Sequence, residues 1–225
     1  MKIGIAGTGK MGLAIGQRLI GLGHQVQVWN RNPARAEPLV AAGAVRVEQP
    51  SALSQQCEIV LSLLTDAAAV EQVYGGPNGL LVHPKALLIE MSTVAPEFQA
   101  QMGQRAAQAG ARYLECPVSG SIGPAREGKL MGFAGGEAEV LARARPVLDG
   151  LCRRVEHVGM HGAGARMKLA INLPLMVYWQ TLGEALSIIE PLGLDPQLVV
   201  ELFSESSGGP NMLKIRGGML TQALA

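Results

Sequence analysis

The sequence predicts an α/β fold in which helices cover both faces of a parallel sheet, followed by a second domain that is entirely helical. Short apolar runs alternate with helical patterns through the first two thirds of the chain, as in doubly wound sheets. After about residue 162 the pattern changes to long amphipathic helices with no strand between them. We therefore expect one domain over residues 1–161 and a second over residues 162–225.

The N-terminal segment carries the most specific motif. An apolar run over residues 1–6 predicts the first strand, and Gly-Thr-Gly-Lys-Met-Gly follows at once and opens a helix. In this order the first glycine makes a tight turn, the second lets a pyrophosphate approach bare backbone, and the third lets the helix pack closely on the strand. The motif predicts a Rossmann-type dinucleotide site; the alternative is a tight turn without a ligand. The residues expected to bind the cofactor here are Gly7, Gly9, Lys10, Met11 and Gly12.

The second strand, expected over Gln25–Trp29, indicates which dinucleotide binds. NAD-binding chains carry an acidic residue about 20 positions beyond the glycines, where it binds the ribose 2′-hydroxyl. Here Asn30 and Arg31 hold that place, and Arg35 follows one turn along the next helix. A guanidinium pairs with a 2′-phosphate, which an aspartate would repel. The pattern predicts NADP(H), with a solvated loop charge as the alternative for Arg31.

Further strands and helices alternate up to residue 158. We expect strands over residues 45–47, 58–63, 86–91, 112–115, 129–134 and 153–158, and helices over residues 34–42, 67–73, 96–109 and 138–148. Ligands of such sheets bind beyond the carboxyl ends of the strands. The segments that follow those ends, 64–66, 92–93 and 117–120, are therefore candidate site segments.

The C-terminal third predicts long helices. An apolar periodicity runs from Gly164 to about residue 189, with Pro174 inside it as a candidate kink or late start. Asp195 and Pro196 are typical of an N-cap and a first helical position, and that helix is expected to end near Ser206. A last short helical run is expected over residues 212–225.

Bulk composition excludes several classes of protein. The 225 residues are 48% hydrophobic and 16% charged, with a net charge of +1, so the chain lacks the basic surface that nucleic-acid binding requires. We expect no membrane span, no signal peptide and a cytoplasmic location. The three cysteines are far apart, and His157 and His161 lie in a glycine-rich turn, so we expect no metal site.

Lys168 and Asn172 form the second informative pattern. They lie four residues apart on the predicted long helix, so their side chains project from the same face. That face is otherwise apolar and near the start of the helix, and both conditions favour a neutral amine able to exchange protons. A carbonyl that receives a hydride develops negative charge on its oxygen, which such a side chain can protonate. The alternative is a lysine whose amine simply reaches water.

Four segments together resemble the β-hydroxyacid dehydrogenase family, which includes 3-hydroxyisobutyrate dehydrogenases and glyoxylate or succinic semialdehyde reductases. They are the N-terminal glycines, Met91–Thr93, Cys116–Ser121 with Gly128–Leu130, and Gly162–Asn172. The resemblance implies that Lys168 is the general acid/base and that Asn172 helps to hold the substrate. It further implies that Ser119 and Gly120 bind a substrate carboxylate. Thr93, Leu63 and Leu64 would then contact the cofactor, with Thr93 also at the substrate.

Three departures from that family pattern matter. Thr8 replaces the usual leucine between the first two glycines. Ser121, with Pro124 and Ala125, is more similar to the glyoxylate and succinic semialdehyde reductases. The sequence stops at Ala225, where family members continue through further helices, so we expect an incomplete second domain. The resemblance also implies a basic residue near the site, and Lys214 is the candidate for it.

The sequence therefore predicts an NADP(H)-dependent oxidoreductase that transfers a hydride between nicotinamide and a small hydroxy acid or carbonyl acid. Two alternatives stay open. One is an imine reductase, although such relatives usually lack a lysine at the position of Lys168. The other is a non-catalytic NADP-binding or assembly module. We also expect a homo-oligomer, either a dimer or a tetramer.

Overall fold

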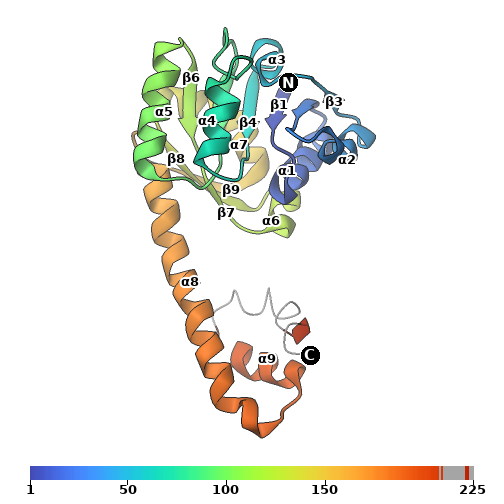
Figure 1. The fold of residues 1–225 in the computed structure, drawn as a ribbon, viewed down its shortest axis with the longest axis vertical. Coiled ribbons are helices and arrows are strands. Elements are labelled where there is room, and N and C mark those ends of the chain that lie inside the picture. The colour runs from blue at the N-terminus through green and yellow to red at the C-terminus, as the bar shows by residue number, and fades with distance from the viewer. Residues whose placement is uncertain (208, 210–220, 223–225) are drawn as a thin grey trace. The chain divides into compact units, whose positions relative to one another are not determined.

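The computed structural model describes residues 1–207, 209 and 221–222, and these form two compact units, Met1–Asn172 and Leu173–Ala225. Among the described residues the first unit is built on a nine-stranded sheet (Figure 1). Its strands are β1 Lys2–Ala6, β2 Gln25–Trp29, β3 Val45–Arg46, β4 Ile59–Ser62, β5 Leu87–Glu90, β6 Arg112–Glu115, β7 Val118–Ser119, β8 Leu130–Gly135 and β9 Cys152–Gly159.

The helices follow the expected alternation. They are α1 Lys10–Gly21, α2 Glu37–Ala41, α3 Pro50–Gln56, α4 Ala67–Gly75, α5 Pro96–Gln108, α6 Ile122–Glu127, α7 Ala138–Leu151, α8 Ala163–Ile189 and α9 Pro196–Glu205, with short 3₁₀ turns at Pro33–Arg35 and Glu190–Leu192. The doubly wound α/β fold predicted from the sequence is thereby confirmed.

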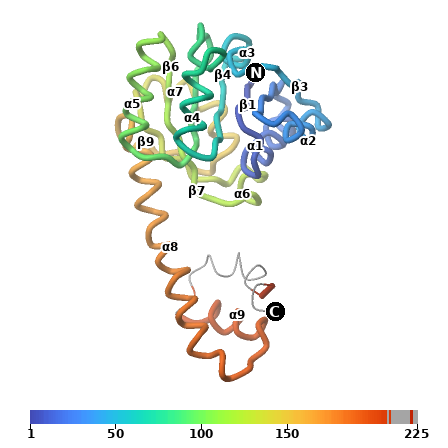
Figure 2. The backbone as a smooth tube through the Cα atoms, in the orientation of Figure 1, coloured from blue at the N-terminus to red at the C-terminus, as the bar shows by residue number. Residues whose placement is uncertain are grey.

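The strand order is β3-β2-β1-β4-β5-β6-β8-β7, with β9 paired to β8. From β1 the chain builds outward through β2 and β3 on one side and through β4, β5 and β6 on the other (Figure 2). The order therefore reverses between β1 and β4, which is where open α/β sheets bind their ligands. All pairs from β3 to β6 are parallel, whereas β8 runs antiparallel to β6 and β7.

Two apolar cores lie on opposite faces of this sheet. In β1, β4, β5 and β6, alternate residues enter opposite cores, as the two-residue period of a strand requires. In β1, Ile3 and Ile5 pack with α1 and α7, while Ala6 packs with α3 and α4 on the other face. Strands buried on both faces read as continuous apolar runs, which is why the sequence located them well.

The sequence missed or misjudged the shorter elements. The single helix expected over residues 34–42 is divided into a 3₁₀ turn and α2, because Pro38 lacks the N–H that a continuous helix needs there. The helices α3 and α6 and the two-residue strand β7 carry too few periodic apolar residues to be predicted.

The second unit contains the later part of α8, the turn Glu190–Leu192 and α9. The predicted N-cap is confirmed, because the Asp195 carboxylate accepts hydrogen bonds from the N–H groups of Gln197 and Leu198 at 2.8 and 3.2 Å. Pro174 lies inside α8, and α9 ends one residue before Ser206.

Within the described part of the chain, no helix is both long and apolar enough to cross a bilayer. Lys214 and most of the run over residues 212–225 lie outside the described residues.

Candidate functional site

The glycine-rich turn lies at the switch point between β1 and β4. Gly7 has a φ of +101°, a conformation that side chains disfavour, and its N–H donates to the Trp29 carbonyl at 2.9 Å. A Cβ at Gly7 would lie 2.3 Å from the Leu63 carbonyl oxygen. The turn is therefore fixed between the ends of β2 and β4.

The other two glycines of the motif have opposite surroundings. A Cβ at Gly12 would lie 2.0 Å from the Gly7 carbonyl oxygen, whereas a Cβ at Gly9 would meet nothing within 4 Å. No side chain caps the N-terminus of α1, and its first turn carries no acidic residue. The N–H groups of this turn and the positive end of the helix dipole thus face open space beside Gly9. These residues fit the phosphates of a dinucleotide.

A groove of about 310 Å³ extends from the glycine turn toward the end of β2. Its lining residues are Gly7, Gly9, Trp29, Asn30, Arg31, Asn32, Arg35, Leu63, Leu64, Thr65, Ala69, Gln72 and Val73. Arg31 and Arg35 are exposed, and among these lining residues there is no carboxylate. The groove therefore presents positive charge to a ligand.

Asn30 has a bracing role in addition to lining this groove. Its side-chain oxygen accepts a hydrogen bond from the Thr8 N–H at 3.0 Å, and its amide nitrogen donates to the Asn32 carbonyl at 2.8 Å. The side chain thus ties the glycine turn to the segment that carries Arg31. The sequence predicted Asn30 as a cofactor contact but not as a brace.

A second cavity, of about 340 Å³, adjoins the first and shares Gly9, Leu63, Leu64 and Thr65 with it. Its lining residues are Gly9, Lys10, Met11, Gly12, Leu63, Leu64, Thr65, Met91, Ser92, Thr93, Val118, Gly120 and Lys168. Lys168 is half-buried here. Chain segments up to 159 residues apart, from Gly9 to Lys168, thus meet at the carboxyl ends of the strands.

The two cavities bring together most of the residues that the sequence selected. Ser119 and Asn172 are exceptions, because neither is among the lining residues of either cavity. Ser119 is half-buried on β7 and pairs with Met131 of β8, next to Gly120. Asn172 is half-buried on α8, one turn beyond Lys168. Their substrate contacts stay predictions.

The sequence analysis did not select two buried carboxylates, Glu90 and Glu115, which end β5 and β6. Glu90 accepts a hydrogen bond from the Ser92 N–H at 3.0 Å, and the Ser92 hydroxyl accepts one from the Leu64 N–H at 2.8 Å. Glu115, its register partner on β6, is also fully buried. A glutamate that ends an otherwise apolar strand is the signal that could have identified both.

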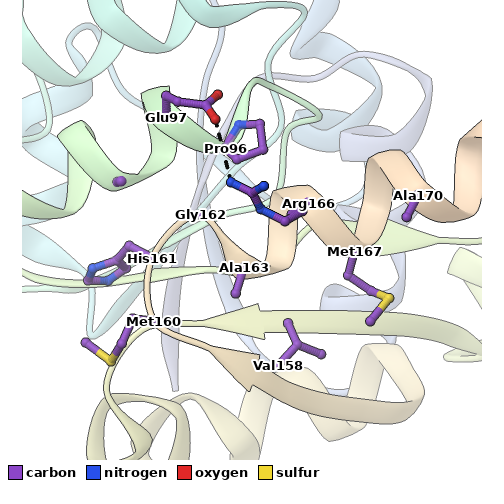
Figure 3. A pocket seen from close by; sticks show the side chains of 11 residues that line it. Pro96, Glu97, Val158, Met160, His161, Gly162, Ala163, Arg166, Met167 and Ala170 are labelled. Atoms are coloured by element: carbon purple, nitrogen blue, oxygen red, sulfur yellow. Dashed lines mark ion pairs between the residues drawn. The ribbon is translucent and has the colours of Figure 1, made fainter.

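Beside the start of α8 lies a third hollow, of about 570 Å³, lined mainly by apolar side chains (Figure 3). Figure 3 shows the turn Met160–Ala163 leading into the helix, with Arg166 directed toward Glu97 of α5 at 3.6 Å. At 100° per residue, Arg166 and Met167 lie on a different face of α8 from Lys168. This hollow is therefore separate from the cavity that Lys168 lines.

The cysteines give no sign of catalytic use. Cys57, Cys116 and Cys152 are all buried as free thiols. Burial raises the pKa of Cys57 to about 11 and that of Cys152 to about 12, so both stay protonated near neutral pH. Within the described residues no group of histidine, cysteine and carboxylate side chains could hold a metal ion.

The doubly wound sheet, the glycine turn at its switch point and the open helix N-terminus define a Rossmann-type dinucleotide-binding protein. A family model described as the NAD binding domain of 6-phosphogluconate dehydrogenase matches residues 2–159. The chain is 38% identical over 228 residues to a 3-hydroxyisobutyrate dehydrogenase of Pseudomonas aeruginosa, covering 99% of this chain and 76% of that protein.

A second relative is glyoxylate/succinic semialdehyde reductase 2 of Arabidopsis thaliana, 30% identical over 226 residues, which cover 100% of this chain and 63% of that protein. The solved structure of Psf3 in complex with NADP+ and 2-OPP superposes with a TM-score of 0.91 at 30% identity, covering 98% of this chain and 79% of that one. An imine reductase from Myxococcus stipitatus, 21% identical with a TM-score of 0.73, shares the fold.

This chain belongs to the β-hydroxyacid dehydrogenase family of NAD(P)-dependent oxidoreductases.

Proposed function

We propose that the protein is an NADP(H)-dependent oxidoreductase that interconverts a small hydroxy acid and the corresponding carbonyl acid, with Lys168 as general acid/base. The observation that carries the proposal is the 340 Å³ cavity, in which Lys168, Gly120 and Thr93 meet the glycine turn. The cavity therefore places a group that can transfer a proton, Lys168, beside the exposed backbone of Gly120 and the dinucleotide site.

Each of these residues has a chemical role in the proposal. Gly120 supplies exposed backbone that binds a carboxylate, and the adjacent Ser119 hydroxyl donates a further hydrogen bond. Lys168 protonates the carbonyl oxygen as negative charge develops on it, or accepts that proton in the oxidation direction. Asn172, one turn along α8, orients the lysine or the substrate. A bound dihydronicotinamide supplies the hydride.

Replacement of Lys168 with alanine tests this role. We expect the Kd for NADPH to stay within about twofold while turnover falls by about 10²-fold or more, because proton transfer is lost but the groove is retained. The assay is NADPH consumption against glyoxylate, succinic semialdehyde, methylmalonate semialdehyde and tartronate semialdehyde, with NADPH formation from 3-hydroxyisobutyrate in the reverse direction. Unchanged turnover would refute the mechanism, whereas tight NADPH binding without turnover on any acid would favour a binding module.

The NADP preference rests on Arg31 and Arg35, which supply the positive charge of the 310 Å³ groove. A hydrogen bond to a charged group contributes about 1.5–3 kcal/mol, so Arg31→Ala is expected to weaken NADPH binding by about 10- to 150-fold. The same change should leave NADH binding nearly unaltered, since NADH has no 2′-phosphate. Equal losses for both nucleotides, measured by fluorescence titration, would contradict the assignment.

A homo-oligomer remains part of the proposal. Leu173, Met176 and Ile188 of α8 are 64, 59 and 79% exposed. Several large apolar side chains exposed on one helix are typical of a subunit interface. Light scattering on the purified chain would give the order of the assembly.

A further inference from the structure

Glu115 connects two segments that are distant in the sequence, and each segment leads to residues that line the 340 Å³ cavity. One of its carboxylate oxygens, Oε1, accepts hydrogen bonds from the N–H groups of Gly162 and Gly164, both at 2.7 Å. These two N–H groups belong to the turn and first residues of α8, the helix that carries Lys168. The carboxylate therefore fixes the start of that helix.

The same glutamate is the last residue of β6, and the chain runs from it directly into Val118 and Gly120. Val118 and Gly120 line the 340 Å³ cavity together with Lys168. One side chain thus joins the strand that leads to Gly120 with the helix that presents Lys168. A change in the length or charge of the Glu115 side chain would therefore alter the distance between Gly120 and Lys168.

The backbone is shaped around this carboxylate. A Cβ at Gly135 of β8 would lie 2.1 Å from Oε1 of Glu115, and a Cβ at Gly164 would lie 3.2 Å from it. Any side chain at these positions would displace the carboxylate or the turn. The second oxygen, Oε2, is buried and has no hydrogen-bond partner among the described residues.

The titratable groups around Glu115 come from three elements. Glu90 lies beside it on β5, Tyr113 and Cys116 lie on its own strand and just after it, and His161 lies in the turn before α8. His161 also holds that turn, because its Nε2 lies 3.2 Å from the Tyr113 carbonyl oxygen and its ring packs against the Tyr113 ring. Arg145 of α7, the helix that packs on β6, opposes the rise in the pKa of Cys116, so a cation also lies near this cluster.

We propose that Glu115 is a positioning residue for Lys168: its carboxylate holds the Gly162–Gly164 turn and so sets the distance between the lysine and the Val118–Gly120 wall. The inference rests on the proposed function, because it gives Lys168 a role in the reaction. Glu115 itself touches neither cavity, since it is absent from the lining residues of both.

The ionisation of Glu115 should make this positioning sensitive to pH. Burial raises its pKa to about 7, and the hydrogen bonds from Gly164 and Gly162 oppose that rise without cancelling it, while the nearby Glu90 adds to it. A carboxylate accepts N–H bonds more strongly than a protonated carboxyl does. Turnover should therefore decline as the pH falls through about 7.

Three variants of the full chain test the proposal. Glu115→Gln keeps an acceptor oxygen for the turn and removes the charge, and Glu115→Leu removes both. Glu139→Gln makes the same chemical change on the exposed face of α7 and serves as the matched control. Each is compared with the parent chain in kcat, KM, Kd for NADPH, the pH profile of kcat, and amide hydrogen exchange of Gly162 and Gly164 in ¹⁵N-glycine-labelled protein.

We expect Glu115→Leu to lose the amide protection of Gly162 and Gly164 and to lower kcat by about 10- to 100-fold, since a displacement of about 1 Å has an effect of this size. The Kd for NADPH should stay within about twofold. In Glu115→Gln the neutral acceptor oxygen should restore the amide protection of Gly162 and Gly164. Its kcat should match the lower value that the parent chain reaches below about pH 7, and the decline of kcat near pH 7 should disappear. Glu139→Gln should match the parent chain in every measurement.

Two results would overturn the proposal. One is normal kcat and an unaltered pH profile in both Glu115 variants while Lys168→Ala is inactive; this would leave the proposed function intact. The other is full activity in Lys168→Ala, or no turnover of any acid by the parent chain, which refutes the proposed function and the inference with it. If Glu115→Leu does not fold, the pH profile of Glu115→Gln tests the proposal. A decline of kcat near pH 7 that persists in Glu115→Gln would belong to another group and would refute the proposal.

Discussion

The two glycines Gly9 and Gly12 are expected to respond to alanine in opposite ways. Both belong to the same motif, and both substitutions add one methyl group. At Gly9 that methyl would enter the space beside the N-terminus of α1, where no described residue other than Gly9 and its two chain neighbours has an atom within 4 Å. At Gly12 it would lie 2.0 Å from the Gly7 carbonyl oxygen. The first space is thus open to a ligand, and the second is filled by the fold itself.

The magnitudes follow from these surroundings. Gly9 has φ −66° and ψ −177°, which alanine adopts without strain, so Gly9→Ala should leave the free energy of unfolding unchanged or raise it by about 0.4–1 kcal/mol. For Gly12→Ala, α1 must move by about 1 Å before the new contact reaches 3.0 Å. Ile15 and Leu19 of α1 are fully buried, so this movement should cost about 1–3 kcal/mol or more through misfit of the core.

Two measurements separate the effects. Urea denaturation without cofactor gives the free energy of unfolding, and titration with NADPH gives the Kd. We expect Gly9→Ala to weaken NADPH binding by at least about tenfold, because the methyl group occupies the approach to the helix N-terminus. Normal NADPH affinity in Gly9→Ala would show that no phosphate approaches there. Parent-like stability in Gly12→Ala would show that the close contact with Gly7 is not a constraint.

Two further predictions concern stability. Asp195→Ala removes the side chain that caps α9, so the second unit should lose about 1 kcal/mol of stability, measured by the hydrogen exchange of the α9 amides; unchanged exchange would count against the cap. The pKa of Glu115 is raised from 4.5 to about 7, so the folded chain binds more protons than the unfolded chain in that window, and the free energy of unfolding should fall as the pH rises from 4.5 to 7. This loss amounts to at most about 3 kcal/mol, and denaturation series at several pH values should show it in the parent chain and not in Glu115→Gln.

Local pattern was sufficient to predict the doubly wound sheet, the dinucleotide site and the N-cap at Asp195. Each of these depends on residues that are neighbours in the chain: apolar runs of strand length, a glycine spacing of two and three, and an aspartate before a proline. The strand bounds Gln25–Trp29 and Arg112–Glu115 agree with the structure without correction. These predictions were confirmed because each pattern lies within a short stretch of the chain.

The sequence by itself therefore determined the fold class, the family and the identity of Lys168 as a candidate. Only the tertiary structure decided that Lys168 shares a cavity with Gly120, Thr93 and the glycine turn, because these residues come from separate crossovers of the sheet. It also decided the place of Glu115, whose partners Gly162 and Gly164 lie 47 and 49 residues further along the chain. A buried carboxylate is recognised by what surrounds it, and burial arises only when distant segments pack together.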